Sequence, residues 1–135
     1  MQSAADEAVS RIIEKWSAGF NRLDAEALSS LYSSSAFFFG SKSQLYRGNA
    51  GVAAYFNALP RWSSPTVQFA DRATAQVNPD LINFAATATF VVDEETAPLS
   101  VKITWVIARA DGDWKIVSHH VSSRTPLLSD EPAAS

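Results

Sequence analysis

The spacing of apolar residues changes once along this chain of 135 residues, and the change limits the folds that the chain can adopt. Up to about residue 60, apolar side chains recur at steps of three and four, as they do on one face of a helix. From about residue 65 onward, stretches rich in Val, Ile, Thr, Phe and Ala alternate with turn residues. Helices followed by strands are typical of an α+β fold and not of alternating βαβ units.

Three helices are expected in the first part. The apolar face of the first helix is formed by Val9, Ile12, Ile13, Trp16 and Phe20. Asp24 is the expected N-cap of a short second helix, which the serine run at 33–35 ends. Phe37 to Phe39 should then form a short buried strand. A third helix follows the Gly-Asn-Ala-Gly segment at 48–51 and stops before Pro60.

Four long antiparallel strands are expected in the second part, and turn residues mark the ends of each. Their predicted ranges are 65–77, 81–93, 99–109 and 113–124. We therefore predict a curved antiparallel sheet of four long strands plus short ones, wrapped around three N-terminal helices.

The composition is that of one globular domain, predicted over residues 1–126 with a C-terminal tail over 127–135. Hydrophobic residues make up 47% and charged residues 19% of the chain. The net charge of −3 gives no electrostatic footprint for nucleic acid or an anionic membrane. The N-terminus lacks the apolar region of a signal peptide, and no apolar run reaches the length of a membrane span. We expect a soluble, cytoplasmic domain that binds neither nucleic acid nor membrane.

Three segments in order, FNRLDAEALSSLY, RGNAGVAAYFNAL and DGDWKIVSHHVSS, resemble the nuclear transport factor 2-like superfamily. They look most like the SnoaL-like proteins and the association domain of calcium/calmodulin-dependent kinase II. The resemblance covers about residues 5 to 126. It implies a cone-shaped fold with an apolar pocket that usually dimerises through its sheet. Fold alone does not fix function, because this fold hosts isomerases, cyclases, dehydratases, transport factors and oligomerisation domains.

The catalytic groups of the better-known relatives are not carried over to this chain. Steroid isomerases of the superfamily use a Tyr and an Asp at places that here look like Trp16 and Gly40. Many SnoaL-like relatives have acids after the second helix, where this chain has serines at 33–35. The arginine-lined pocket of the kinase domain is similar in shape, but its matching positions here look like Trp105 and Val121.

The chain has two histidines, His119 and His120, and they are adjacent. Neighbouring residues of a regular strand point to opposite faces, so the two side chains cannot share one metal site. With no cysteine in the chain, we expect no metal and no cofactor.

The hairpin between the last two strands decides which histidine points inward. A three-residue loop, Ala110-Asp111-Gly112, would place Arg109 opposite Asp113 and Ile103 opposite His119. His119 then shares the more apolar face, which should turn toward the helices, and His120 lies outside. A two-residue Asp-Gly turn would pair Ile103 with His120 and reverse this assignment.

These faces give the candidate residues. His119 is the expected acid–base group, as the only inward group with a pKa near neutrality; the plainer alternative is a hydrogen-bonded core histidine. The expected ligand-binding residues are Trp16, Tyr32, Phe56, Arg72, Trp105 and Val121. The expected homodimer interface, on the outer face, contains Thr104, Trp114, Ile116 and His120.

Asp71 and Arg72 are successive strand residues, so one of them should face inward, and the sequence does not decide which. An inward Arg72 would suit a carboxylate ligand; the plainer alternative, which the sequence favours, is that it pairs across the sheet.

Three functions remain open. The first is a binding domain for a small apolar or weakly acidic molecule, anchored by His119. The second is a SnoaL-like enzyme of isomerase, cyclase or dehydratase type with His119 as general acid/base. The third is an oligomerisation module. The sequence favours the first, because recognised catalytic acids are missing while the aromatic residues that could line a pocket are present.

Overall fold

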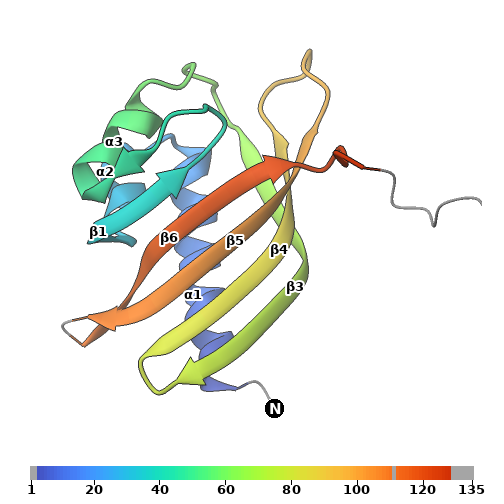
Figure 1. The fold of residues 1–135 in the computed structure, drawn as a ribbon. Coiled ribbons are helices and arrows are strands. Elements are labelled where there is room, and N and C mark those ends of the chain that lie inside the picture. Colours follow the sequence, from blue (N-terminus) through green and yellow to red (C-terminus); the bar gives the residue numbers. More distant parts are fainter. Residues whose placement is uncertain (1–2, 111, 129–135) are drawn as a thin grey trace, which may run out of the picture.

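The computed structural model describes residues 3–110 and 112–128, and the fold is α+β, as predicted (Figure 1). These residues form three helices, α1 (Ala4–Asn21), α2 (Ala25–Ser29) and α3 (Gly48–Asn57), all of which precede the four long strands. Two short or medium strands, β1 (Tyr32–Phe39) and β2 (Tyr46–Arg47), lie between α2 and α3. The four long strands follow and are β3 (Thr66–Asn78), β4 (Leu81–Val91), β5 (Leu99–Ala110) and β6 (Asp113–Ser123).

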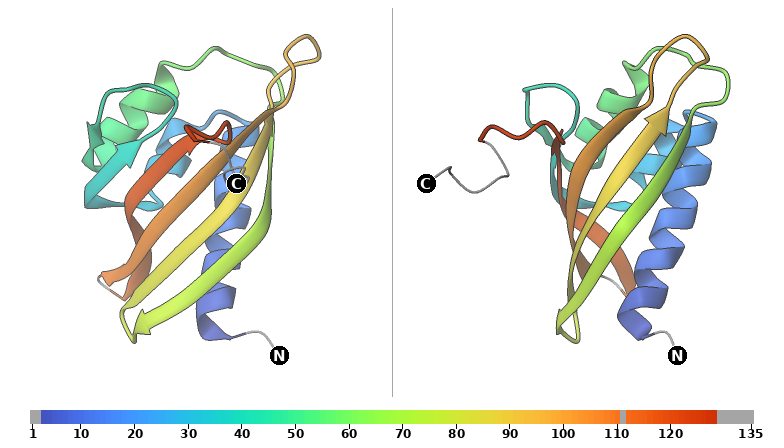
Figure 2. Two further views of the ribbon diagram at one scale, coloured as in Figure 1. Left: turned by 45° about the vertical axis from the view of Figure 1, so that its right-hand side comes forward. Right: turned by 90° about the vertical axis from the view of Figure 1, so that its right-hand side faces the viewer.

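The helices form where capping and apolar spacing predict them. The Ser3 side chain accepts a hydrogen bond from the Asp6 amide at 3.1 Å and so caps α1. The Asp24 side chain caps α2 through the Ala27 amide at 3.0 Å, as expected. The α1 stripe that includes Val9, Ile12, Trp16 and Phe20 is buried. It packs against the inner face of the curved sheet, along which α1 runs (Figure 2).

The strands form one mixed sheet in the order β2-β1-β6-β5-β4-β3. The long strands pair antiparallel in a meander, while β1 pairs parallel with β6. The inner face of β4 and β5 buries alternate residues such as Ile82, Phe84, Ile103 and Trp105. In β1 the same alternation buries only Phe38 of the three phenylalanines. The prediction of a fully buried strand is therefore wrong for Phe37 and Phe39, which are exposed.

The β5–β6 hairpin differs from its predicted register in two places. Ala110 pairs with Asp113, so the loop is the two-residue alternative; Gly112 has a φ of 78°, and Asp111 lies outside the described residues. Further along, Val106 pairs with Ser118 but Ile107 pairs with Ile116, which leaves Val117 as a bulge.

The bulge restores the face that the shorter loop would have reversed. His119 lies opposite Trp105, and Ile103 lies opposite Val121, not opposite His119 as predicted. His119 is nevertheless on the inner face, because a one-residue bulge reverses the alternation once more. Between the bulge and the turn the alternation is opposite to the prediction, with Ile116 completely buried.

Candidate functional site

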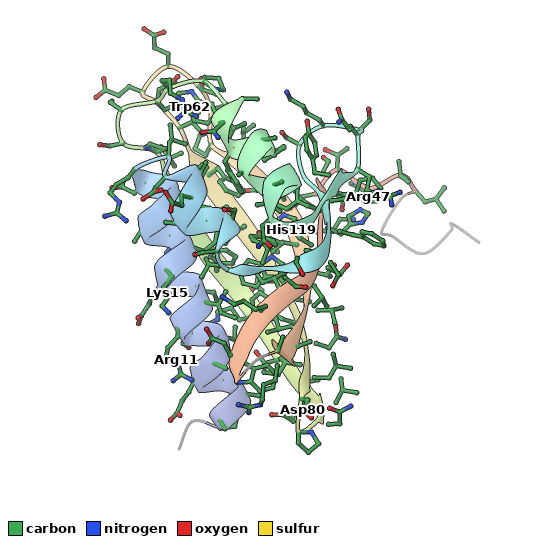
Figure 3. All side chains as sticks on the ribbon, turned by 90° about the vertical axis from the view of Figure 1, so that its left-hand side faces the viewer. Arg11, Lys15, Arg47, Trp62, Asp80 and His119 are labelled. Carbon is green, nitrogen blue, oxygen red and sulfur yellow. The ribbon has the colours of Figure 1, made fainter. Side chains whose placement is uncertain are left out.

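A cavity of about 150 Å³ lies between α1, α3 and the inner face of the sheet. Its walls are mainly apolar and are formed by residues of α1 (Trp16, Phe20), α3 (Tyr55, Phe56) and β6 (His119, Val121). Trp62, Ser41 and Leu99 line it from loops and strand ends. Figure 3 shows His119 between β6 and the helical layer, with Trp62 near one end of the molecule and Asp80 at the other. A cavity of this size is large enough for about one aromatic ring.

His119 is the buried polar residue of the cavity wall, with 3% of its surface exposed. The indole Nε1–H of Trp105 donates to its Nδ1 at 2.9 Å. An indole nitrogen can only donate, so Nδ1 must be unprotonated and must accept. In the neutral imidazole the proton is therefore on Nε2, which makes Nε2–H a donor.

Tyr32 connects His119 to the first helix. Its Oη lies 2.9 Å from Nδ1 of His119 and accepts a hydrogen bond from Nε1–H of Trp16, also at 2.9 Å. Since Nδ1 has no proton, the Tyr32 hydroxyl donates its own proton to Nδ1. Two donors thus converge on one imidazole nitrogen, and this arrangement fixes both the tautomer and the orientation of the ring.

The other imidazole nitrogen, Nε2, has no hydrogen-bond partner in the part of the chain that the structure describes. Yet among those residues no fully buried side-chain nitrogen or oxygen lacks a partner. Nε2 is therefore accessible from the cavity that His119 lines. The result is one N–H donor in a largely apolar wall.

Burial lowers the pKa of His119 to about 3, with a smaller contribution from the neighbouring His120. The imidazole is therefore neutral at physiological pH, which contradicts the expectation of a pKa near neutrality. Burial also raises the pKa of Tyr32, so its hydroxyl keeps its proton and remains a donor to His119.

Phe38 of β1 covers one face of the His119 ring. The two ring centroids are 4.0 Å apart and the planes are inclined by 17°. This stacking and the two hydrogen bonds at Nδ1 hold the imidazole in one position before any ligand enters. Such preorganisation reduces the entropy lost on binding.

Sequence reasoning missed a second polar group in the cavity wall, formed by Ser41 and Tyr55. The Ser41 amide donates to Oη of Tyr55 at 2.9 Å, and Ser41 Oγ lies 2.6 Å from the same Oη. The preceding residue is Gly40, where a Cβ would come within 2.7 Å of the rings of Phe38 and Tyr55. Glycine is thus needed here for the close approach of these rings, which the sequence does not indicate.

The predicted ligand-binding residues separate into three groups. Trp16, Phe56 and Val121 line the cavity together with His119. Tyr32 and Trp105 are among the residues with no more than 1% of their surface exposed, and they lie behind His119 as its hydrogen-bond partners. These two predicted residues therefore do not line the cavity.

Arg72 is not in the cavity either. A bulge between Ala70 and Ala73 leaves both Asp71 and Arg72 exposed, with Asp71 at a φ of 51°. The Arg72 guanidinium donates to Ser10 Oγ of α1 at 3.0 Å. One of the pair therefore turns toward the helices, as expected, and it is Arg72, but it lies at an exposed position and not in the cavity.

The predicted interface residues divide between the two faces of the sheet. Thr104 and His120 pair across β5 and β6 and are exposed on the outer face. Ile116 is buried opposite Ile107, and the half-buried Trp114 packs against the core and lies over Arg109, whose Cζ is 4.4 Å from its ring centroid. The two-residue loop places these two residues, which lie between the turn and the bulge at Val117, on the inner face, so assigning them to an outer interface was wrong.

The sequence profile of the SnoaL-like domain matches residues 9–126. The chain belongs to the SnoaL-like domain family. Sequence comparison with curated proteins finds no match. The family fits the geometry described above, in which three helices and a curved, open sheet enclose a cavity.

Several solved structures share this fold at low sequence identity. A candidate calcium/calmodulin-dependent protein kinase II association domain from Xanthomonas campestris is 19% identical, covers 93% of this chain and 91% of its own, and has a TM-score of 0.82. LinA is 16% identical, with 98% and 95% covered and a TM-score of 0.80. A candidate aromatic ring hydroxylase from Novosphingobium aromaticivorans is 15% identical, with 89% of both chains covered and a TM-score of 0.75.

No helix within residues 3–110 and 112–128 is both long and apolar enough to cross a membrane. In the same part of the chain, no three His, Asp or Glu side chains are grouped as metal ligands would be.

Proposed function

We propose that this SnoaL-like domain binds a compact, mainly apolar small molecule in the cavity beside α1, with an uncharged acceptor atom of the molecule bound to Nε2–H of His119. The hydrogen bond from Trp105 to Nδ1 of His119 carries the proposal, because it makes the opposite nitrogen the donor. A small number of precisely placed polar groups in an apolar wall is the usual means of orienting an apolar ligand, and His119 is the buried one here.

The walls favour an uncharged ligand group over a carboxylate. None of the described residues lining the cavity is Lys, Arg, Asp or Glu, and Arg72 is bound to Ser10 elsewhere. A buried carboxylate would face a neutral imidazole with no counter-charge, which is costly in an apolar site. A carbonyl or ether oxygen needs one donor, and His119 supplies one.

The same geometry weighs against the alternative of an enzyme with His119 as general base. A base must take up a proton, but Nε2 already has one and Nδ1 accepts from Trp105 and Tyr32. Protonation of Nδ1 would place a third hydrogen against those two donors in a buried site. Neutral His119 can still polarise a carbonyl as a hydrogen-bond donor, which is a binding contribution with or without chemistry.

Nitrogen NMR of protein labelled with ¹⁵N-histidine tests the proposal directly. Acetophenone is the probe with an acceptor, and α-methylstyrene has nearly the same shape without one. We expect His119 to show a protonated Nε2 and an unprotonated Nδ1 at pH 7. Acetophenone should shift the Nε2 resonance to saturation, while α-methylstyrene should quench tryptophan emission without a comparable shift.

His120 is the internal control, since its exposed ring should respond to neither probe. A proton on Nδ1 of His119, or no saturable response of emission or resonance to either probe, would refute the proposed function.

A further inference from the structure

Ser41 and Tyr55 form the second polar group of the cavity. One of their two hydroxyl protons is not used in the hydrogen bonds between them. The Ser41 amide donates to Oη of Tyr55, and one hydrogen bond joins that oxygen to Ser41 Oγ. Two hydroxyls provide two protons, and a single contact between them takes one. The other proton has no acceptor among the described residues.

The free proton belongs to Ser41. Tyr55 Oη already accepts from a backbone amide, which polarises the phenol and strengthens it as a donor. Either oxygen could donate in the 2.6 Å contact, but a phenol is a better acid than an aliphatic hydroxyl, which favours Tyr55 as the donor to Ser41 Oγ. The hydroxyl of Ser41 is then left to donate. Ser41 is exposed and lines the cavity, so this proton is at its mouth.

The two donor groups of the cavity wall both contact Phe38. Phe38 stacks on His119 at 4.0 Å and meets the ring of Tyr55, the partner of Ser41, at a centroid distance of 4.7 Å. The deep donor, His119 Nε2–H, and the outer donor, Ser41 Oγ–H, thus belong to neighbouring parts of the wall of one cavity. Other lining residues near them are apolar or aromatic, including Phe56, Leu59 and Val121.

We propose that the ligand is a small ring compound with two uncharged acceptor oxygens, one bound by His119 deep in the cavity and the other bound by Ser41 at its mouth. This inference rests on the proposed function and adds the chemical class of the ligand. Tyr55 is the positioning residue of the outer donor, since its hydroxyl holds Ser41 Oγ in place. Two separated donors select against a hydrocarbon or a compound with one acceptor.

The test uses 4-methoxyacetophenone, which has two acceptor oxygens, and 4-ethylacetophenone, which has nearly the same shape and lacks the second oxygen. Dissociation constants for both are measured by tryptophan emission with the wild-type chain, Ser41→Ala and Ser43→Ala. Ser43 is an exposed serine of the same loop that does not line the cavity, so its replacement is the matched control. Both substitutions are at exposed positions and should leave the fold intact.

We expect the wild-type chain and Ser43→Ala to prefer the methoxy compound by about fivefold, the effect of one neutral hydrogen bond. Ser41→Ala should reduce this preference to about one by weakening the methoxy compound alone. Equal binding of the two compounds by the wild-type chain, or a preference that Ser41→Ala leaves unchanged, would overturn the outer donor while the proposed function stands. Failure of both compounds to bind would refute the proposed function itself, and this inference with it.

Discussion

Trp105 and His119 face each other directly across the β5–β6 ladder, and the indole of the first donates to Nδ1 of the second at 2.9 Å. The pair links sheet register to site chemistry. If the register were one residue different, an exposed histidine would replace the buried one and the cavity would lose its deep donor. Because the donor to Nδ1 is an indole, His119 is fixed in the neutral form with its proton on Nε2. Protonation of His119 at low pH is therefore measurable as a loss of folding stability.

The first prediction concerns pH. Folding lowers the pKa of His119 from 6.5 to about 3, so between these values the unfolded chain binds a proton that the folded chain does not. Stability should therefore be highest above pH 6.5 and fall as the pH decreases, with a slope of up to about 1.4 kcal/mol per pH unit. Urea denaturation between pH 7 and pH 5 measures this slope above the range in which carboxylates titrate. His119→Gln should flatten it, and a wild-type stability constant over this range would contradict the buried neutral histidine.

The elements of the fold could be predicted because local chemistry specifies them. The stripe from Val9 to Phe20, the cap at Asp24 and the turn residues between strands each act over a few positions, and the helices and the four long strands formed close to their predicted ranges. The serine run at 33–35 is the exception, because it lies inside β1 and does not end α2. The bulge at Val117 could not be predicted. It is at the point where β6 also changes register against β1, between Tyr32 and Phe37. The pairing of β1 with β6 joins segments distant in sequence, and local residue patterns do not contain it.

The candidate site shows the same division. The face predicted for His119 and Val121 is correct because the shorter loop and the bulge at Val117 cancel, whereas helical spacing placed Trp16 and Phe56 correctly. Whether an inward residue lines the cavity or lies behind a lining residue depends on how far its side chain is from the cavity. The periodicity of the sequence predicts the face of a residue and not this distance. Tyr32 and Trp105 were therefore predicted on the correct face, but they lie behind His119 as its hydrogen-bond partners and do not form the cavity wall.

The second prediction separates a buried hydroxyl from one at the cavity mouth. Tyr32→Phe removes the acceptor of Trp16 Nε1–H inside the core, where water cannot replace it. We expect a loss of about 1–3 kcal/mol in unfolding free energy. Tyr55→Phe is the matched control, because its partner Ser41 is exposed and can bond to water, so its loss should be below about 1 kcal/mol. Equal losses of unfolding free energy for the two variants, measured by urea denaturation, would mean that the Tyr32 hydroxyl is not in a buried hydrogen-bond network from which water is excluded.

The third prediction uses the tryptophans as reporters. Trp16 lines the cavity and contacts Phe20 with a centroid distance of 5.4 Å, whereas Trp114 does not line it and packs against Arg109. A saturating concentration of acetophenone should quench the emission of the wild-type chain. Trp16→Phe should remove much of that quenching and weaken binding several-fold, while Trp114→Phe should keep the quenching and the affinity. The reverse pattern would place the ligand outside this cavity.

The last prediction concerns self-association, for which we propose the outer face of the sheet. Phe37 and Phe39 are 51% and 37% exposed on β1, and the ring of Phe39 lies 5.4 Å from that of His120, beside Thr104 on the next strand. Aromatic side chains next to small polar ones form a poor monomer surface and a typical interface.

Light scattering over a concentration series should show a wild-type dimer at micromolar concentration and a monomer for Phe39→Asp, because a buried carboxylate without a partner is costly. His120→Ala should weaken the dimer by about fivefold, the effect of one interfacial hydrogen bond. Val77→Asp is the control, since Val77 is 58% exposed on β3, an edge strand that β4, β5 and β6 separate from β1. A wild-type monomer, or a dimer that Phe39→Asp leaves intact, would exclude this face as the interface. The Nε2 donor of His119 lies on the other side of the sheet, so the chain should bind acetophenone both as a monomer and as a dimer.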